Sequence, residues 1–182
     1  MRYVLLIVLL LSLCGCASYQ PTVAAQFDPL PTPIDETEVL PPPPPVDMVQ
    51  AQCLALNVYH EARGEGVEGM VAVAFVTLNR AQDTTRRFRN TVCGVVRQGA
   101  YSAGRIILHR CEFSWYCDGR SDRPTDQQAY QHALELAVAV LQGTVPNPIG
   151  QAVYYHRADL KWRYASHFTP VVSIRNHTFY RA

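Results

Sequence analysis

The sequence has no excess of charge of either sign. Its 182 residues carry 16 Lys and Arg against 15 Asp and Glu, which gives a net charge of +1. Nucleic-acid-binding domains are usually strongly basic, so no nucleic-acid partner is expected. The length is that of one domain with additional segments, which excludes a two-domain enzyme.

Long apolar runs are also missing. The run Val4–Leu13 follows Arg2 and has ten residues, whereas a membrane-spanning helix needs about 20. A charged start, a short apolar run and small residues after it are typical of a secretory signal. The segment Leu13-Cys-Gly-Cys16 resembles the lipobox of bacterial lipoproteins. That resemblance implies a signal peptide over residues 1–16 and lipidation of Cys16, with ordinary cleavage after a small residue as the alternative.

Residues 17–46 contain no Lys or Arg, four acidic residues and nine of the thirteen prolines. Such a segment buries too little apolar surface to offset its conformational entropy, so we expect a disordered tether that spans at most about 90 Å. A proline-rich ligand for an SH3-like partner is the alternative. The remaining domain, residues 47–182, holds 15 basic and 11 acidic residues. Its charge of +4 is expected to form a solvated basic face, with attraction of a carboxylate-rich polymer as the alternative.

Apolar periodicity predicts an α+β domain, mainly helical, with a small antiparallel sheet towards the C-terminus. The run Met70–Val76 is apolar on all sides, which favours a central buried helix over a strand. Helices are expected over residues 47–62, 67–80 and 91–98, with Gly64 as the stop of the first. A capping box of Thr125 and Gln128 should begin another helix, which Gly143 ends. We expect residues 101–123 to be mostly irregular, and strands over residues 152–156, 171–174 and 177–180.

Four cysteines follow the signal. In an exported domain, Cys53, Cys93, Cys111 and Cys117 predict two disulfides, and three pairings remain open. A zinc site is less favoured because five residues separate Cys111 from Cys117, more than the usual two to four. A cysteine nucleophile paired with His156 would lose its thiol if both bridges form.

The segment Tyr59-His-Glu-Ala-Arg-Gly-Glu65 places Glu61 and Glu65 four residues apart at a helix end. Neighbouring carboxylates repel, which favours a protonated member and hence the proton donor that a glycosidase needs. Arg63 could neutralise Glu65 and leave Glu61 as the titrating acid. A zinc peptidase helix is excluded because position 64 is Gly rather than His.

The same region carries a resemblance to a known family. Residues 53–65 and 68–80, together with Cys111-Glu-Phe-Ser-Trp-Tyr-Cys-Asp-Gly119, resemble the cell wall hydrolase family of spore-cortex-lytic (SleB-type) enzymes. The similarity continues through residues 91–96, Ala152-Val-Tyr-Tyr-His156, Trp162 and His177-Thr-Phe-Tyr-Arg181. One departure is Ile174-Arg-Asn-His177, where the family usually has Ile-Gly before its His.

The resemblance implies a catalytic domain like lysozyme or a lytic transglycosylase, which cuts peptidoglycan glycan strands without a metal or other cofactor. It assigns the essential acid to Glu61 and a structural or supporting role to Glu65. In the transglycosylase version, Glu61 alone acts as acid and then as base. In the hydrolytic version a second acid, Glu65 or Asp118, is expected.

Supporting roles stay open between substrate binding and packing. Phe113 and Trp115 could stack on sugar rings or fill the core. Tyr155 and His156 could line the groove or lie in the core, and His177 is expected to be structural.

The function hypothesis is therefore peptidoglycan cleavage during envelope remodelling by a monomer, lipid-anchored to the outer membrane and facing the periplasm. A non-catalytic peptidoglycan-binding lipoprotein is one alternative. A metal-dependent amidase or peptidase that uses His156, His177 and a carboxylate is the other.

Overall fold

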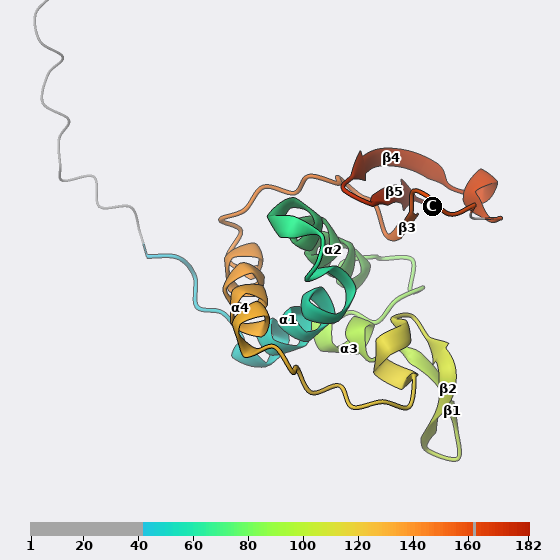
Figure 1. Cartoon of the computed structure of the whole chain (residues 1–182), viewed down its shortest axis with the longest axis horizontal. Coiled ribbons are helices and arrows are strands. Elements are labelled where there is room, and N and C mark those ends of the chain that lie inside the picture. The colour runs from blue at the N-terminus through green and yellow to red at the C-terminus, as the bar shows by residue number, and fades with distance from the viewer. Residues whose placement is uncertain (1–41, 162) are drawn as a thin grey trace, which may run out of the picture. The chain divides into compact units, whose positions relative to one another are not determined.

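The apolar run Met70–Val76 occupies the middle of α2 (Gly66–Ala81), and every residue in it is buried. A computed structural model describes residues 42–161 and 163–182. In this structure α2 lies between the other helices and the C-terminal sheet (Figure 1). The prediction of a central buried helix is therefore confirmed, and so is the α+β fold class.

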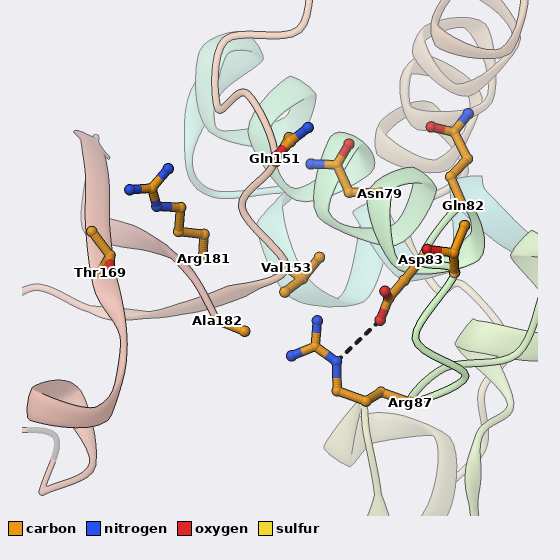
Figure 2. A pocket seen from close by; sticks show the side chains of 10 residues that line it. Asn79, Gln82, Asp83, Arg87, Gln151, Val153, Thr169, Arg181 and Ala182 are labelled. Carbon is orange, nitrogen blue, oxygen red and sulfur yellow. Dashed lines mark hydrogen bonds and ion pairs between the residues drawn. The ribbon is translucent and has the colours of Figure 1, made fainter.

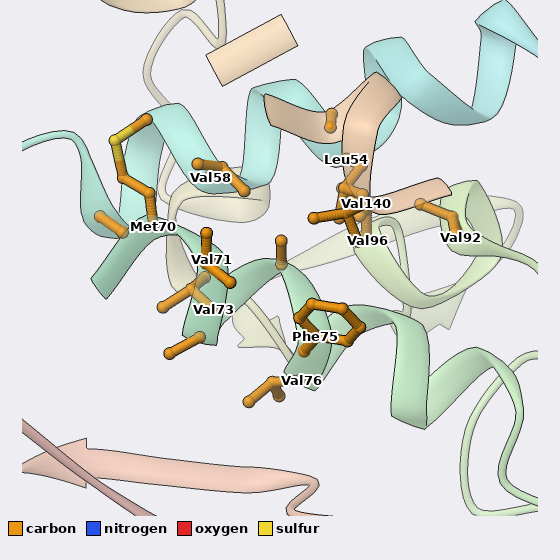
Figure 3. Close-up of a cluster of buried hydrophobic side chains, with 14 of the residues drawn as sticks. Leu54, Val58, Met70, Val71, Val73, Phe75, Val76, Val92, Val96 and Val140 are labelled. Carbon is orange, nitrogen blue, oxygen red and sulfur yellow. The ribbon is translucent and has the colours of Figure 1, made fainter. Parts of the chain in front are cut away.

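Three helices pack on α2 or on its neighbours: α1 (Met48–Ala62), α3 (Val92–Val96) and α4 (Gln127–Leu141). Figure 3 shows how Leu54 and valines of these three helices meet the side chains of α2. The α1 helix begins at Asp47, whose carboxylate accepts a hydrogen bond from the Val49 backbone N–H at 2.9 Å. The helices expected over residues 47–62, 67–80 and 91–98 are confirmed as α1, α2 and α3, with every boundary within two residues.

The predicted N-cap of α4, Thr125, is wrong. Asp126 is the N-cap, and its Oδ1 accepts from the Ala129 N–H at 3.0 Å. Thr125 instead lies 3.4 Å from the Tyr59 hydroxyl, so its side chain turns towards α1 rather than towards its own helix. Gly143 has φ +73° and follows the last turn, which confirms the predicted end.

The C-terminal strands form the predicted antiparallel sheet. It contains β3 (Tyr154–Arg157), β4 (Thr169–Ile174) and β5 (His177–Arg181) in the order β3-β5-β4. Tyr155 pairs with Phe179 across β3 and β5. Phe179 is fully buried, so this face of the sheet closes the core over α2.

Residues 101–123 are more ordered than expected. They contribute to a hairpin of β1 (Gly99–Ser102) and β2 (Arg105–Cys111), followed by the short 3₁₀ helix η1 (Ser114–Cys117). Ala103 and Gly104 both have positive φ, as a tight hairpin turn requires. The prediction of irregular structure is wrong because the register shifts between Gly99 and Tyr101 and most of the hairpin is exposed, so no clean alternation marks it.

Two disulfides join Cys53 to Cys93 and Cys111 to Cys117. The first ties α1 to α3, and the second closes the end of β2 onto η1. The structure thus selects one of the three pairings and excludes a zinc site or a free thiol at these four cysteines.

The predicted signal peptide, the predicted lipidation site Cys16 and most of the predicted tether lie outside the described residues. Residues 42–47 contain neither helix nor strand. None of the helices in the described part of the chain combines the length and the hydropathy needed to span a bilayer.

Candidate active site

A groove of about 570 Å³ lies where the end of α1, strand β3 and the β4–β5 turn come together. It collects five of the residues singled out from the sequence, which are Glu61, Glu65, Tyr155, His156 and His177. The other lining residues are Arg157, Leu160 and Asn176.

Glu61 lies in the last turn of α1 and is half-buried. The Tyr155 hydroxyl donates a hydrogen bond to Glu61 Oε2 at 2.7 Å. Burial raises the pKa of Tyr155 well above its usual value, and the neighbouring Glu61 carboxylate raises it further. The phenol therefore stays protonated and remains a donor to this carboxylate.

Glu65 is bound differently from Glu61. Its Oε2 accepts from the Asn176 backbone N–H at 3.2 Å, and its Oε1 accepts from the Asn176 side-chain amide at 3.3 Å. The expected pairing with Arg63 is wrong, because Arg63 turns back to donate to the Tyr59 carbonyl at 3.1 Å and lies over the Tyr59 ring. Glu65 thus joins the α1–α2 loop to the β4–β5 turn.

Glycines make room for this junction. Gly66, rather than the predicted Gly64, takes the left-handed conformation, with φ +69°. A Cβ on Gly69 would lie 2.4 Å from Glu65 Cβ, so a side chain there would displace the carboxylate. Position 69 therefore requires glycine, because the Glu65 side chain occupies the space that a Cβ would take.

His177 lines the groove and is mostly buried. Its Nδ1 lies 3.9 Å from Glu65 Oε2, and its ring meets the Tyr155 ring edge-on at 5.1 Å. Burial lowers the pKa of His177, although the charges of Glu65 and Glu61 oppose this. The neutral imidazole is therefore the favoured form.

Arg80 joins α2 to the strand that carries Tyr155. Its Nε donates to the Val153 carbonyl at 2.8 Å, two residues before Tyr155. The guanidinium is buried, and its carbon lies 5.0 Å from the ring centres of Phe88 and Phe113. Burial lowers the pKa of Arg80, while the nearby Tyr155 and acidic groups oppose that shift.

The two aromatic candidates of the central segment do not line the groove. Phe113 is 2% exposed and packs against Arg80, so it fills the core, which was the alternative to sugar stacking. Trp115 stacks on His60 with ring centres 4.3 Å apart, and its indole N–H donates to Asn57 at 3.0 Å. One face of the indole is therefore already covered.

Sequence reasoning missed three residues of the groove, namely Arg157, Leu160 and Asn176. Asn176 lies between two predicted strands, in the segment that departs from the family pattern. A polar residue in the turn between those strands was the signal that could have indicated it. Arg157 pairs with Asp159 at 2.7 Å. In residues 42–161 and 163–182, no three His, Cys, Asp or Glu side chains are grouped as metal ligands would be.

Comparison with known proteins identifies the fold and the family together. The sequence model of the Cell Wall Hydrolase family matches residues 64–180, which is more than half of the chain. The chain belongs to this family. The matched range begins three residues after Glu61, so it contains Glu65 and the rest of the groove but not Glu61 itself.

This chain is also similar in sequence to individual spore cortex-lytic enzymes. The spore cortex-lytic enzyme of Bacillus cereus is 34% identical over 114 residues, which are 61% of this chain and 37% of that protein. The enzyme of Oceanobacillus iheyensis is 35% identical over 112 residues, 59% of this chain and 32% of that protein. The chain thus matches about a third of the length of these curated relatives.

Two solved structures cover more of the fold. The catalytic domain of Bacillus cereus SleB aligns with a TM-score of 0.53 and 27% identity, over 76% of this chain and 94% of that one. The catalytic domain of the germination-specific lytic transglycosylase SleB from Bacillus anthracis aligns with a TM-score of 0.55 and 27% identity. The alignment covers 78% of this chain and 100% of that one. The cell wall hydrolase described here therefore has the fold of the SleB catalytic domain.

Proposed function

We propose that this chain cleaves peptidoglycan glycan strands with Glu61 as its single general acid and base. The observation that carries the proposal is the Tyr155 hydrogen bond to a glutamate on the wall of a groove, at 2.7 Å. Support also comes from the family and from the lytic transglycosylase activity named for the Bacillus anthracis structure.

The geometry suggests how the proton moves. Oε2 of Glu61 accepts from Tyr155, which leaves Oε1 to carry a proton to the glycosidic oxygen. As the C1–O bond breaks, the leaving sugar takes this proton and an oxocarbenium-like centre develops on the other sugar. The Tyr155 hydroxyl then stabilises the Glu61 carboxylate that remains, which prepares it to act as a base.

We further propose that the sugar's own C6 hydroxyl, rather than water, completes the reaction. Glu61 takes the C6 hydroxyl proton, the C6 oxygen bonds to C1, and a 1,6-anhydro sugar forms. Hydrolysis would need a second carboxylate that is free to act, but both oxygens of Glu65 accept hydrogen bonds from Asn176. Asp118, the other candidate, does not line the groove and accepts from the Arg120 N–H at 2.8 Å.

We place this activity at the cell envelope, in wall remodelling. The proposal rests on the signal-like residues 1–16 with a lipidated Cys16, the proline-rich residues 17–46 as a tether and residues 47–182 as the catalytic domain. On this basis we propose that the protein is anchored by lipid to the outer membrane and faces the periplasm, and we propose separately that it is a monomer. Labelled palmitate should enter the wild-type chain but not a Cys16→Ala variant; equal labelling of both would contradict the anchor.

The decisive experiment for the activity compares the full chain with Glu61→Gln, which keeps the side-chain shape and removes the proton. The matched control is Glu135→Gln on the exposed surface of α4. We expect soluble fragments with anhydro-muramic ends from the wild type and from the control, and none from Glu61→Gln. Equal activity of Glu61→Gln would overturn the assignment of the acid.

Other outcomes identify the alternatives. Reducing ends on the fragments would mean hydrolysis rather than transglycosylation. Freed stem peptides, lost on treatment with a strong chelator, would mean a metal-dependent amidase or peptidase. Binding to peptidoglycan without any release from the wild type would mean a non-catalytic binding protein.

A further inference from the structure

A second cavity, of about 600 Å³, opens at the other end of the C-terminal sheet (Figure 2). It lies between the end of α2 with its following loop, the segment before β3, and the ends of β4 and β5 that are remote from the groove. No residue lines both sites. The lining residues are Asn79, Gln82, Asp83, Thr84, Arg87, Gln151, Val153, Thr169, Arg181 and Ala182.

Arg87 is prearranged in this cavity. Its Nε donates to Asp83 Oδ2 at 3.1 Å and to Thr85 Oγ1 at 2.8 Å. Although burial opposes the shift, hydrogen bonds from Thr85 and Arg87 lower the pKa of Asp83, so this carboxylate stays charged and holds the guanidinium in place. The two terminal nitrogens of Arg87 point into the open space beside Val153 (Figure 2). A guanidinium edge presented in this way matches a carboxylate.

The remaining walls supply neutral hydrogen-bonding groups and a second cation. Arg181 and Thr169 come from β5 and β4, and three side-chain amides come from Asn79, Gln82 and Gln151. The Asn79 amide is fixed by donation to the carbonyls of Gly150 and Ala152, each at 2.8 Å.

This lining favours a peptide over a saccharide. The side-chain amides of Gln82 and Gln151 can bind peptide groups, and the guanidinium groups of Arg87 and Arg181 can bind a carboxylate. None of the lining residues is aromatic, so no ring is available for a sugar to stack on.

The groove and the cavity lie at the two ends of one strand. His177 lines the groove and Arg181 lines the cavity, four residues further along the same strand, β5. At about 3.4 Å per residue this is roughly 14 Å.

We propose that this cavity binds the carboxylate-bearing stem peptide of the glycan strand whose sugars occupy the groove. The proposal rests on the proposed function, because the groove must hold a peptidoglycan strand. The Arg87 guanidinium would receive a peptide carboxylate, with Arg181 and the side-chain amides as further partners.

Direct binding tests the cavity without requiring cleavage. The full Glu61→Gln chain, in detergent, is titrated in a calorimeter with the free stem tetrapeptide and with its carboxyl-amidated form. We expect the free peptide to bind and amidation to weaken binding about tenfold or more, as loss of a charge-assisted hydrogen bond does. Adding Arg87→Gln or Arg181→Gln should have a similar effect.

Arg86→Gln is the matched control, since Arg86 is the exposed neighbour of Arg87, carries the same charge and does not line the cavity. It should leave the affinity unchanged. Arg181→Gln guards against misfolding, because its side chain is exposed at the end of β5, whereas Arg87 supports its own loop. Equal affinity for both peptides, or equal losses from Arg86→Gln and Arg181→Gln, would overturn the proposal.

Cleavage separates this proposal from the proposed function. Arg181→Gln should raise KM for peptide-bearing strands and leave KM unchanged for strands stripped of peptide. The same rise on both substrates would mean that the cavity binds saccharide and would refute a peptide site. If the wild type cut neither substrate but still bound the free peptide, the glycosidase assignment would fail while the peptide site would stand.

Discussion

Tyr155 and Glu61 are 94 residues apart in the chain, yet the Tyr155 hydroxyl donates to Glu61 Oε2 at 2.7 Å. The two side chains come from a helix end and a sheet strand, so this contact forms only when the sheet docks on the helices. Arg80 supports the docking by donating to the Val153 carbonyl. The position of the proposed acid therefore depends on how the two parts of the domain pack.

Replacement of Tyr155 by Phe should lower kcat by about tenfold to a hundredfold, since a hydrogen bond to a charged group contributes about 1.5–3 kcal/mol. KM should change little because Tyr155 acts through Glu61. Steady-state release of soluble fragments measures both constants. Tyr154→Phe, on the adjacent residue of β3, is the control and should retain wild-type turnover. Wild-type turnover in Tyr155→Phe would show that the hydrogen bond is not used.

The two disulfides should contribute unequally to stability. In the chain-entropy account, a bridge over 40 residues stabilises by about 4 kcal/mol and one over 6 residues by about 2 kcal/mol. Denaturant unfolding of Cys53→Ala/Cys93→Ala and of Cys111→Ala/Cys117→Ala measures the difference. A larger loss of unfolding free energy in Cys111→Ala/Cys117→Ala would contradict this expectation and would show that η1 depends more on its disulfide than α1 and α3 do.

His177 should make the domain less stable in mild acid. Its native pKa is lower than the unfolded value of 6.5, so the unfolded chain binds the proton more readily. Stability is full above about pH 6.5 and falls as the pH drops through that value. Glu65, Glu61, Arg157 and His156 act on the same ring.

The test of this pH dependence compares the unfolding free energy of the wild type and of His177→Gln between pH 5 and 8. The variant should show a flatter curve, and the difference between the two proteins should shrink towards low pH. Parallel curves would show that His177 does not cause the dependence.

Asn57 should be costly to replace. Its side chain accepts from the Trp115 indole N–H at 3.0 Å and donates to Thr77 Oγ1 at 2.9 Å, and both Asn57 and Thr77 are fully buried. Asn57→Leu should lower the free energy of unfolding by about 2–3 kcal/mol because these groups lose their partner. Gln52→Leu, on the exposed face of α1, is the control. Equal unfolding midpoints for the two variants would show that the hydrogen bonds of Asn57 to Trp115 and Thr77 do not stabilise the domain.

Much of the secondary structure could be predicted because it depends on local patterns. The apolar run Met70–Val76 specifies a buried helix by itself, and Gly143 ends α4 because a glycine takes positive φ without strain. The β1–β2 hairpin escaped prediction because its register shift and exposed strands hide the alternation. The cap of α4 was misassigned because the neighbouring Thr125 and Asp126 both suit that position, and contact with Tyr59 decides between them.

The sequence by itself determined the chemistry that is present: one glutamate in the last turn of a helix and a second in the loop after it, four cysteines suited to disulfides, and late strands that carry Tyr155 and His177. Only the tertiary structure decided which of these groups meet. In the folded domain Glu65 accepts hydrogen bonds from Asn176 rather than pairing with Arg63, and Glu61 accepts one from Tyr155. Phe113 is buried in the core. The reason is physical, since a helix or strand forms from neighbours in the chain, whereas a carboxylate takes the donor that packing brings to it.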